Sequence, residues 1–356
     1  MATREHFHTI IIGGGQAGLA AAHFLSQAGI EYMILDAGPG FGHSWRRRWD
    51  SLRLFTPAKF SGLPGMTFPG EAFAMPTKDM TARYMEDYAA GLNPTVQFNT
   101  RVDSLSRTDD GFRVKAGAQS FLSSRVIVAT GTYQKPFVPL FASQLDQGIL
   151  QLHSSAYRNP LQFPQGPVLV VGAGNSGAEI ALELAISGRR VWLSGRDVGR
   201  IPADVLGSVF GGRPYWWLVS RVLSVDTPIG RRVRHTLLSR GTPLIGLKPK
   251  EIVKAGVTRV GRTADARDGR LVLEGGQALE VSAVVWATGF HPDFSWIQLA
   301  ICDENGYPRH DRGVATDVAG LYFLGLPFQR SLSSSLIGGV GADAQYISRI
   351  ALSAKP

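Results

Sequence analysis

The sequence contains a single cysteine, Cys302, among its 356 residues. One cysteine cannot form an intramolecular disulfide, a thiolate zinc site or a redox dithiol. Long hydrophobic runs are also lacking, since no uninterrupted apolar stretch reaches the roughly 18 residues that a membrane-spanning helix needs. The first apolar run, Ile10 to Ile12, breaks at once into glycines, which argues against a secretory signal. We therefore expect a soluble, cytoplasmic protein without membrane insertion.

Concentrated charge is scarce, although the formal net charge is +9. The basic residues are scattered, and only Arg46 to Arg48 and the group Arg231, Arg232 and Arg234 cluster. This distribution favours attraction of anionic nucleotides over a nucleic-acid-binding stripe. We find neither a metal-ligand cluster nor a set of nucleophile, base and orienting residue. We therefore expect no nucleic-acid partner, no bound metal and an enzyme whose cofactor supplies the chemistry.

Glycine, by contrast, is abundant, with 42 residues, and part of it forms a motif that occurs twice. Each copy is a glycine-rich motif that is followed, later in the chain, by an apolar run ending in Ala-Thr-Gly. The first copy comprises Gly13, Gly15 and Gly18 with Ala129, Thr130 and Gly131, and the second comprises Gly172, Gly174 and Gly177 with Ala287, Thr288 and Gly289. The repetition predicts two dinucleotides bound in one molecule.

The surrounding pattern supports this prediction. In the first copy, residues 8–12 read as a buried strand, 16–27 as a helix and 31–35 as the next parallel strand. The second copy repeats this order at 168–171, 175–186 and 190–193. A strand, a glycine turn, a helix and a strand within about 30 residues are typical of a dinucleotide-binding unit. We expect an α/β fold with two Rossmann-like dinucleotide-binding domains, the second inserted in the first.

The repeat also predicts how the chain divides. We expect an FAD-binding domain over residues 1–157 and 285–356, and an NAD(P)H-binding domain over 158–284. A helical insertion should span about 202–250, and its Trp216 and Trp217 indicate core or lid packing. Further elements are expected as a helix at 77–90, short strands at 96–98, 112–115 and 321–324, and a closing helix at 335–349.

The first glycine motif suits a nucleotide without a 2'-phosphate. Gly13 permits the tight turn, Gly15 lets the backbone approach a diphosphate, and Gly18 lets the helix pack on the strand. The helix N-terminus offers free N–H groups and a partial positive charge. Asp36 lies 18 residues after Gly18, where a carboxylate accepts hydrogen bonds from a ribose and repels a 2'-phosphate. This site therefore suits the adenosine half of FAD or NAD.

The second motif differs at the corresponding place. Ser194 and Arg196 follow the strand, and no acid appears before Asp197. A guanidinium can form paired hydrogen bonds with a phosphate. We therefore expect NADPH, with Arg196 as the residue that recognises the 2'-phosphate, helped by Ser194. Arg189 and Arg190 are further candidates, and Asp197 leaves NADH open as the donor.

At this point the sequence resembles a known family, the class B flavin-dependent monooxygenases, in particular the compact bacterial flavin-containing monooxygenases. The resemblance covers nearly the whole chain. It rests on G-G-G-Q-A-G-L-A, W-D-S-L-R-L-F-T-P, H-S-S-A-Y, V-V-G-A-G-N-S-G-A-E-I-A, W-A-T-G-F and L-Y-F-L-G. It implies FAD and NADPH as cofactors, with O2 and a small nucleophile as substrates. It also implies a C4a-(hydro)peroxyflavin that oxygenates a thioether sulfur or an amine nitrogen, and a homodimer.

The resemblance carries over to individual residues. His153 and Tyr157 match the family's linker fingerprint, but Gln147 and Ile149 stand where its phenylalanine and glycine would be. Tyr157 in place of tryptophan favours heteroatom oxygenation over Baeyer-Villiger chemistry, and Phe55 replaces an asparagine that animal members place near the flavin. The candidate catalytic residues are thus His153, Tyr157 and Phe55. The candidate cofactor-binding residues beyond the two Ala-Thr-Gly turns are Gly13, Gly15, Gln16, Gly18, Asp36, Trp45, Arg53, Gly172, Gly174, Asn175, Ser176, Gly177, Ser194, Arg196 and Ser335.

Three other functions share parts of this pattern. A pyridine-nucleotide disulfide reductase needs a redox cysteine pair, which the chain lacks. A ferredoxin or quinone reductase needs no cysteine and remains open. The third is a non-catalytic accessory flavoprotein that senses NADPH.

Overall fold

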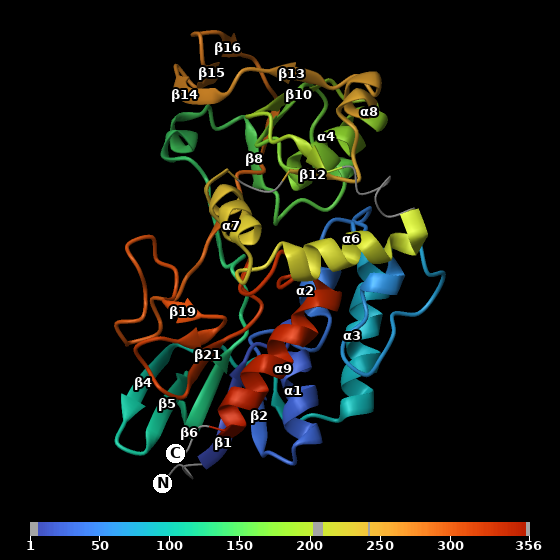
Figure 1. Cartoon of the computed structure of the whole chain (residues 1–356). Coiled ribbons are helices and arrows are strands. Elements are labelled where there is room, and N and C mark those ends of the chain that lie inside the picture. The colour runs from blue at the N-terminus through green and yellow to red at the C-terminus, as the bar shows by residue number, and fades with distance from the viewer. Residues whose placement is uncertain (1–5, 202–208, 241–242, 354–356) are drawn as a thin grey trace.

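The computed structural model describes residues 6–201, 209–240 and 243–353. Its elements form two lobes, one built on a sheet of mixed parallel and antiparallel strands and the other on a parallel sheet, each with helices against it, so the fold is mixed α/β (Figure 1). Each lobe contains one glycine turn between a buried strand and a helix. The helices α6 and α7 lie where the lobes meet (Figure 1).

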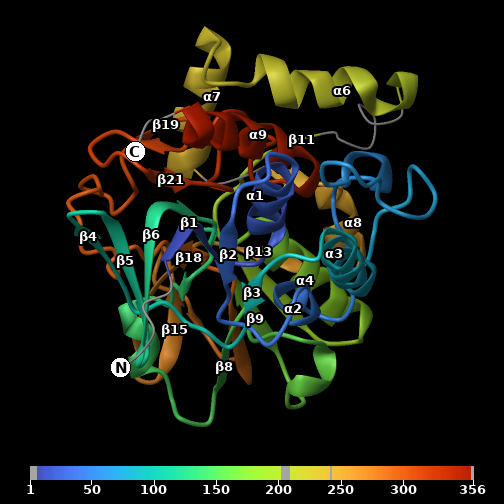
Figure 2. The ribbon, with the colours of Figure 1, turned by 90° about the horizontal axis from the view of Figure 1, so that it is seen from below.

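The first lobe contains the larger sheet. Its strands run in the order β19 (His310–Asp311), β20 (Val314–Ala315), β21 (Leu321–Phe323), β6 (Gln119–Val128), β1 (His6–Ile12), β2 (Tyr32–Leu35) and β3 (Val96–Gln97), with β5 (Gly111–Ala116) and β4 (Ser104–Thr108) attached to β6. Its helices are α1 (Gln16–Gln27), α2 (His43–Arg46), α3 (Lys78–Leu92) and α9 (Ile337–Ser353), with the 3-10 turn η1 (Ala58–Phe60). Figure 2 shows α1 and α9 side by side against the sheet.

Strand β1 is buried on both faces, as its continuous run of apolar residues requires. Ile11 packs toward α1 and α9, whereas Ile10 and Ile12 pack with Val126 on the opposite face. The alternation follows from the two-residue period of a strand. Burial on both sides holds the glycine turn after Ile12 at the carboxyl edge of the sheet, where ligands of parallel sheets bind.

The second lobe has a wholly parallel sheet. Its strands run in the order β13 (Thr258–Val260), β10 (Val191–Ser194), β9 (Val168–Val171), β17 (Ala283–Trp286) and β8 (Leu150–His153). Helices α4 (Asn175–Ile186) and α8 (Pro249–Lys254) and the 3-10 turns η2 (Leu140–Gln144) and η3 (Pro160–Gln162) belong to this lobe, with an antiparallel sheet of β14 (Thr263–Arg267), β15 (Arg270–Leu273) and β16 (Ala278–Leu279). On one face of this sheet Val170 belongs to the same core as Ile180 of α4. On the other face Leu169 belongs to the same core as Leu271 of β15.

The chain passes between the lobes at one short antiparallel pair, β7 (Lys135–Pro136) and β18 (Phe290–His291). Strand β7 begins four residues after Gly131 of the first Ala-Thr-Gly turn, and β18 begins directly after Gly289 of the second. This changes the expected division at residues 157 and 285, because both β8 and β17 pair within the second sheet. We therefore place the division at β7 and β18.

The expected insertion is a predominantly helical segment, which we call the cap (residues 209–240). It comprises η4 (Val209–Gly212), α6 (Arg213–Trp217), the π-helical turn η5 (Leu218–Val222) and α7 (Pro228–Arg240). The rest of the insertion includes β12 (Leu244–Ile245), which pairs with β11 (Arg200–Ile201), and α8. Residues 202–208 and 241–242 lie outside the described part.

Most expected elements are present with shifts of one or two residues. The helices expected at 16–27 and 175–186 and the strand expected at 168–171 are confirmed with the same bounds. The helix expected at 77–90 runs over Lys78–Leu92, and the closing helix runs over Ile337–Ser353. Among the described residues, no helix has both the length and the apolar character needed to cross a bilayer.

Candidate active site between the lobes

The first glycine turn forms a tight junction between β1, α1 and the first Ala-Thr-Gly turn. A Cβ on Gly18 would lie 1.9 Å from the carbonyl oxygen of Gly13, and one on Gly13 would lie 2.7 Å from that of Ala129. Gly13 also has a φ of 108°, which L side chains rarely adopt. Gly15 differs, because nothing lies within 4 Å of the Cβ it would carry. The backbone at Gly15 is therefore open to a ligand.

Asp36 closes this turn from the end of β2. Its Oδ2 accepts the Gly14 N–H at 2.5 Å and its Oδ1 accepts the Gly38 N–H at 2.7 Å. An ionised carboxylate has about four acceptor positions, so two hydrogen bonds leave others for a ligand. Asp36 also lines a pocket of about 340 Å³ with Gly15, Thr130 and other residues of the turn. The structure thus brings the glycine motif, Asp36 and Thr130 around one pocket.

The second glycine turn repeats this construction. A Cβ on Gly177 would lie 1.8 Å from the carbonyl oxygen of Gly172, and one on Gly172 would lie 2.2 Å from that of Ala287. Gly174 has nothing within 4 Å, and α4 begins after it without a side-chain cap. The first N–H groups of α4 therefore stay available for an anion.

The side chain of Asn175, at the start of α4, is used within the protein. Its Nδ2 donates to the carbonyl oxygen of Pro243, and its Oδ1 accepts the N–H of Ile245. These bonds hold the end of the insertion beside the second glycine turn. Ser176 follows in the first turn of the helix and is partly exposed.

The structure corrects the expected role of Ser194. Its side chain is fully buried, and its Oγ donates to the carbonyl oxygen of Gly261 and interacts with the N–H and Oγ1 of Thr263. These contacts leave it unable to reach a 2'-phosphate. Arg189 and Arg190 are also occupied elsewhere.

The two preceding arginines have structural contacts of different kinds. Arg189 donates to the carbonyl oxygens of Pro160 and Phe163, 3.0 and 2.9 Å away. The guanidinium of Arg190 lies 4.7 Å from the ring centroid of Trp192. Both guanidinium groups are engaged within the protein. This corrects the prediction that they help to recognise the 2'-phosphate.

Two other arginines border the turn that follows β10. Arg196 is exposed, and no described residue pairs with its side chain. Arg259, at the equivalent end of the neighbouring strand β13, donates to the carbonyl oxygen of Gly195 at 3.0 Å. Asp197 accepts the N–H of Gly199. The positive charge at this edge therefore comes from Arg196 and Arg259, of which sequence analysis identified only the first.

His153 supports the second Ala-Thr-Gly turn. Its Nε2 lies 2.9 Å from the carbonyl oxygen of Gly289, and its Nδ1 lies 2.9 Å from Oγ of Ser155. Its ring also contacts that of Phe290 edge to face, with centroids 4.9 Å apart. Burial lowers the pKa of the imidazole, although the Gly289 carbonyl raises it in part. Burial thus favours the neutral imidazole, and the contacts of His153 position the turn.

Tyr157 is a core residue. Its side chain has no exposed surface and its hydroxyl donates to Oε2 of Glu183 at 2.8 Å. Burial, with Glu183 as a further cause, raises its pKa far above the ordinary value. Because its side chain is enclosed in the core, it cannot contact a substrate. This corrects the prediction that Tyr157 is a catalytic residue.

The segment W-D-S-L-R-L-F-T-P runs between the lobes. Trp49 and Leu52 pack into the core of the second lobe, whereas Leu54 packs into that of the first. The alternation of anchors turns Arg53 and Phe55 toward the space between the lobes. Trp45, just upstream, is partly buried and contacts both cores.

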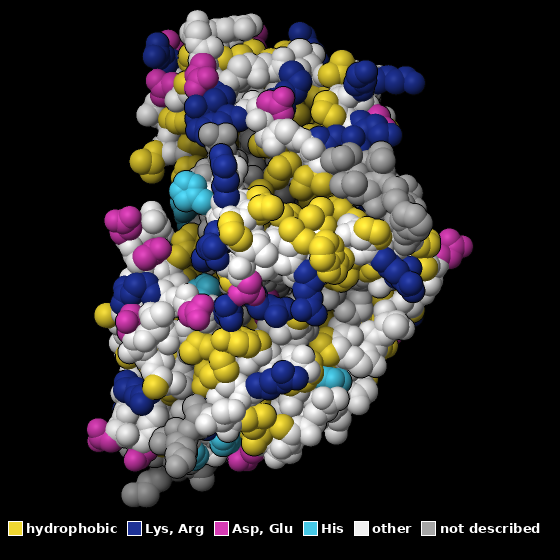
Figure 3. Space-filling view, viewed as in Figure 1, with side chains coloured by type: hydrophobic (Ala, Val, Ile, Leu, Met, Phe, Trp, Pro, Cys, Tyr) yellow, Lys and Arg dark blue, Asp and Glu magenta, His cyan; other side chains and the backbone are white. Residues whose placement is uncertain are grey.

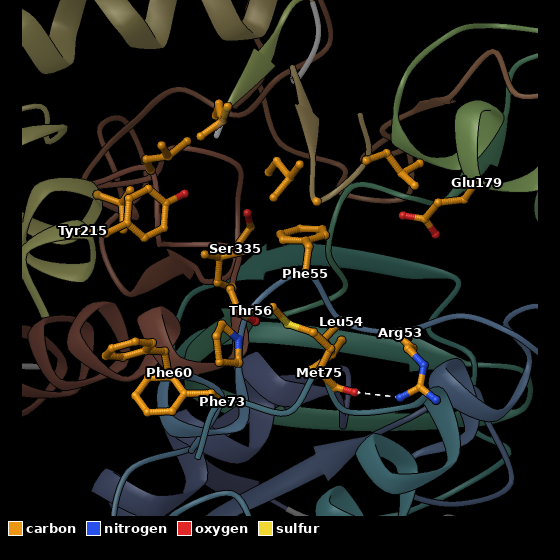
Figure 4. A pocket seen from close by; sticks show the side chains of 18 of the residues that line it. Arg53, Leu54, Phe55, Thr56, Phe60, Phe73, Met75, Glu179, Tyr215 and Ser335 are labelled. Atoms are coloured by element: carbon orange, nitrogen blue, oxygen red, sulfur yellow. Dashed lines mark hydrogen bonds between the residues drawn. The ribbon is translucent and has the colours of Figure 1, made fainter. Parts of the chain in front are cut away.

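That space is a cavity of about 940 Å³, which we call the central cavity. Both lobes and the cap contribute to its walls. Its lining includes Ser51, Arg53, Phe55, Thr56, Phe60, Phe73, Tyr133, Glu179, Leu182, Glu183, Tyr215, Trp216, Leu247 and Ser335. Figure 4 shows Phe55 and Ser335 near its middle, Glu179 at one end and Tyr215 at the other. Figure 3 shows hydrophobic side chains gathered over α6, with lysine and arginine side chains around them.

One hydrogen bond and one short chain segment lie between the central cavity and the smaller pocket. Gln16, the first residue of α1, donates from Nε2 to the carbonyl oxygen of Ser335 at 3.0 Å. Thr130 lines the smaller pocket, and Tyr133, three residues later, lines the central cavity. A dinucleotide that begins at the first glycine turn can therefore extend toward Ser335. Here Ser335 contributes its carbonyl oxygen to Gln16.

Two acidic residues of α4 were missed by sequence analysis. Glu179 and Glu183 lie one helical turn apart and both line the central cavity. Burial, and secondly the neighbouring Glu183, raises the pKa of Glu179 to about 7. No described residue forms a hydrogen bond or ion pair with Glu179. The signal was two glutamates at i and i+4 on the apolar helix that follows a glycine turn.

Comparisons with known proteins place the chain among flavoprotein relatives. A family described as "Pyridine nucleotide-disulphide oxidoreductase" matches residues 10–206. The chain is 41% identical over 341 residues to the oxidoreductase CzcO-like of Geobacillus kaustophilus, which covers 95% of this chain and 96% of that protein.

Solved structures and plant relatives add to this. The flavin-containing monooxygenase from Stenotrophomonas maltophilia superposes with a TM-score of 0.79 at 27% identity, over 98% of each chain. Indole-3-pyruvate monooxygenase YUCCA1 of Oryza sativa subsp. japonica is 35% identical over 208 residues, which is 57% of this chain and 51% of that protein. A bacillithiol disulfide reductase from Bacillus cereus, at 19% identity and a TM-score of 0.71, shares the fold.

Proposed function

Because this chain belongs to the pyridine nucleotide-disulphide oxidoreductase family, as a class B flavin-dependent monooxygenase, we propose that it transfers one oxygen atom of O2 to a thioether sulfur or an amine nitrogen. NADPH is the proposed electron donor. The reaction balances when NADPH, a proton, O2 and the substrate give NADP+, water and the sulfoxide or N-oxide. Two electrons from NADPH reduce one oxygen atom to water, and the substrate lone pair takes the other atom.

The observation that carries the proposal is that both glycine-turn lobes face the central cavity. The first lobe contributes Phe55, Thr56 and Ser335, and the second contributes Glu179 and Leu182 from α4. Helix α4 begins at the second glycine turn, so a nucleotide bound there lies at the N-terminal end of the helix. We propose that each lobe is a Rossmann-like dinucleotide-binding unit and that the reactive rings of the two cofactors meet in this cavity.

The residues present fit two bound dinucleotides. Gly15 and Gly174 leave open the space that a Cβ would fill, and neither helix start is capped by a side chain. A diphosphate can therefore approach the free N–H groups at each turn. Asp36 suits the unsubstituted ribose of FAD in the first lobe. When bound, FAD supplies hydride acceptance and oxygen activation, which no side chain of this lining provides.

The second lobe supports NADPH in preference to NADH. Arg196 is exposed at the edge of the sheet, and Arg259 borders the same turn through its bond to Gly195. Two guanidinium groups beside a ribose favour a 2'-phosphate. The carboxylate of Asp197 accepts the N–H of Gly199. That bond draws the carboxylate toward its own loop.

The chain's own residues serve mainly to exclude water and to position the reactants. The central cavity is lined largely by apolar side chains and is bordered by the cap. Such a lining protects a reactive oxygen species from water and from stray protons. Cys302, the one thiol, packs on the opposite face of the first sheet near Ile297 and does not line the central cavity. A disulfide relay is therefore absent from the proposal.

The experiment that tests the proposal follows one oxygen atom. Purified protein containing FAD is mixed with NADPH without oxygen, and loss of the flavin colour is recorded. Heavy-isotope oxygen and methyl para-tolyl sulfide are then added, and the product is analysed by mass spectrometry. We expect a sulfoxide that carries one heavy oxygen atom for each NADPH oxidised. Hydrogen peroxide as the only oxygen product would instead favour a reductase or an oxidase.

A further inference from the structure

The end of the central cavity beneath the cap is built from aromatic rings. Phe60 and Phe73 come from the first lobe, and Tyr215 and Trp216 come from α6 of the cap. The rings of Phe60 and Trp216 are stacked, with centroids 5.1 Å apart and planes inclined by 12°. This end, which we call the aromatic end, is therefore shared between the lobe that carries the first glycine turn and the cap.

The cap is fixed to the first lobe by backbone hydrogen bonds. The N–H of Val225 donates to the carbonyl oxygen of Arg330 at 2.8 Å, and the N–H of Leu332 donates to that of Leu223 at 2.9 Å. These bonds join the cap to the segment that leads into Ser335 and α9. The aromatic end therefore has a defined place relative to the middle of the cavity.

One polar group interrupts the aromatic end. The hydroxyl of Tyr215 points toward Ser335 and Phe55 (Figure 4). No residue in the described part of the chain forms a hydrogen bond with it, and burial raises its pKa. Tyr215 is half-buried, and its hydroxyl, which lies in a largely apolar wall, is therefore available to donate to an acceptor on a ligand. A phenylalanine at this position would offer the same ring without a donor.

The opposite end of the cavity belongs to the proposed electron donor. Glu179 projects there from α4, the helix that follows the second glycine turn (Figure 4). Thr56 and Ser335, near the middle, come from the lobe that would hold FAD. With the donor at one end and the flavin in the middle, the aromatic end remains for the substrate. Arg53 and Glu179 lie away from it in Figure 4.

We propose that the aromatic end is the substrate site, that the Phe60–Trp216 stack holds an apolar, ring-sized body, and that the Tyr215 hydroxyl donates to a neutral acceptor on it. Within the proposed function, this favours as substrates uncharged aryl or similarly bulky thioethers that carry a carbonyl or ether oxygen. The inference rests on that function for the identity of the reacting atom. The binding site itself can be tested without turnover.

The test compares two probes that differ in one acceptor. Methyl para-tolyl sulfide has no carbonyl, whereas para-(methylthio)acetophenone carries one on the same ring. Their dissociation constants for oxidised protein with FAD and NADP+ bound are measured by equilibrium dialysis. We expect Tyr215→Phe to weaken the acetophenone about tenfold, the effect of one lost hydrogen bond, and to leave the tolyl sulfide nearly unchanged. Phe60→Leu should weaken both probes about threefold or more, because it removes the stack.

Tyr346→Phe is the matched control, because Tyr346 packs on the core of the first lobe and does not line the cavity. It should change neither constant. Equal effects of Tyr215→Phe on the two probes, or no effect on either, would overturn the inference. The proposed function fails separately. In that case the probes bind, and the variants change their dissociation constants as expected, but wild-type protein with NADPH and O2 yields no sulfoxide.

Discussion

The Nε2 atom of His153 lies 2.9 Å from the carbonyl oxygen of Gly289, so that the edge strand β8 is tied to the second Ala-Thr-Gly turn. Gly289 has a φ of 85°, and its carbonyl oxygen also accepts the N–H of Phe137. The imidazole therefore stabilises the point at which the chain passes between the lobes. His153 belongs to the family's linker fingerprint, and its position at this crossing gives it a structural role.

Removal of this hydrogen bond should lower the stability of the fold more than it changes the rate of flavin reduction. We expect His153→Ala to lower the free energy of unfolding by about 1 kcal/mol, because the hydrogen bond to the Gly289 carbonyl and the ring contact with Phe290 are lost. Thermal unfolding followed by circular dichroism measures the loss. The flavin reduction rate at saturating NADPH should keep its pH dependence, since burial holds the imidazole neutral. A pH profile that loses an ionisation in this variant would instead give His153 a part in proton transfer.

Gly174 should be replaceable without harm to the fold. Its φ of −74° is open to any residue, and no atom lies within 4 Å of the Cβ it would carry. Gly174→Ala should therefore retain its melting temperature and its FAD, but raise KM for NADPH about tenfold or more, because the methyl group occupies the approach of the diphosphate. Gly91→Ala, which also meets open space but lies in α3, is the control. An unchanged KM in Gly174→Ala would contradict this assignment of the second site.

Discrimination between NADPH and NADH should depend on two arginines. Arg196→Ala and Arg259→Ala should each lower the ratio of kcat/KM for NADPH to that for NADH about tenfold, because each removes a cation from the 2'-phosphate. Arg190→Ala should leave the ratio unchanged, since its guanidinium stacks on Trp192. Steady-state kinetics with both donors measure the effect. If neither arginine alters the ratio, NADPH recognition lies elsewhere.

The features that were predictable from sequence are local ones. The glycine turns and the bounds of α1 and α4 follow from residues within one short segment. The burial of Ser194 does not, because its partners Gly261 and Thr263 lie 67 and 69 residues away. Strand β8 pairs with β17, which follows it by 133 residues (Leu150 with Ala283), and this distant pairing displaced the expected domain boundary. The aromatic end is harder still, because its rings come from separate segments that meet only in the folded chain.

The half-buried carboxyl group of Glu179 should make stability fall with rising pH. Its pKa is raised from 4.5 to about 7, first by burial and then by Glu183. The folded protein therefore holds a proton that the unfolded chain releases. This contribution to stability is fully present below pH 4.5 and is lost as the pH rises through about 7, to a limit of roughly 3 kcal/mol.

Glu179→Gln should remove this dependence, because an amide stays neutral throughout. The melting temperature of the variant should then exceed that of the wild type at about pH 8 and approach it near pH 5. Glu280→Gln is the control, since Glu280 is exposed and forms a surface ion pair with Arg270. Thermal unfolding of the three proteins across this range measures the difference. Parallel curves for Glu179→Gln and the wild type would mean that the carboxyl group is already ionised and solvated in the folded protein, and that the cavity wall around α4 is more open to water than its lining indicates.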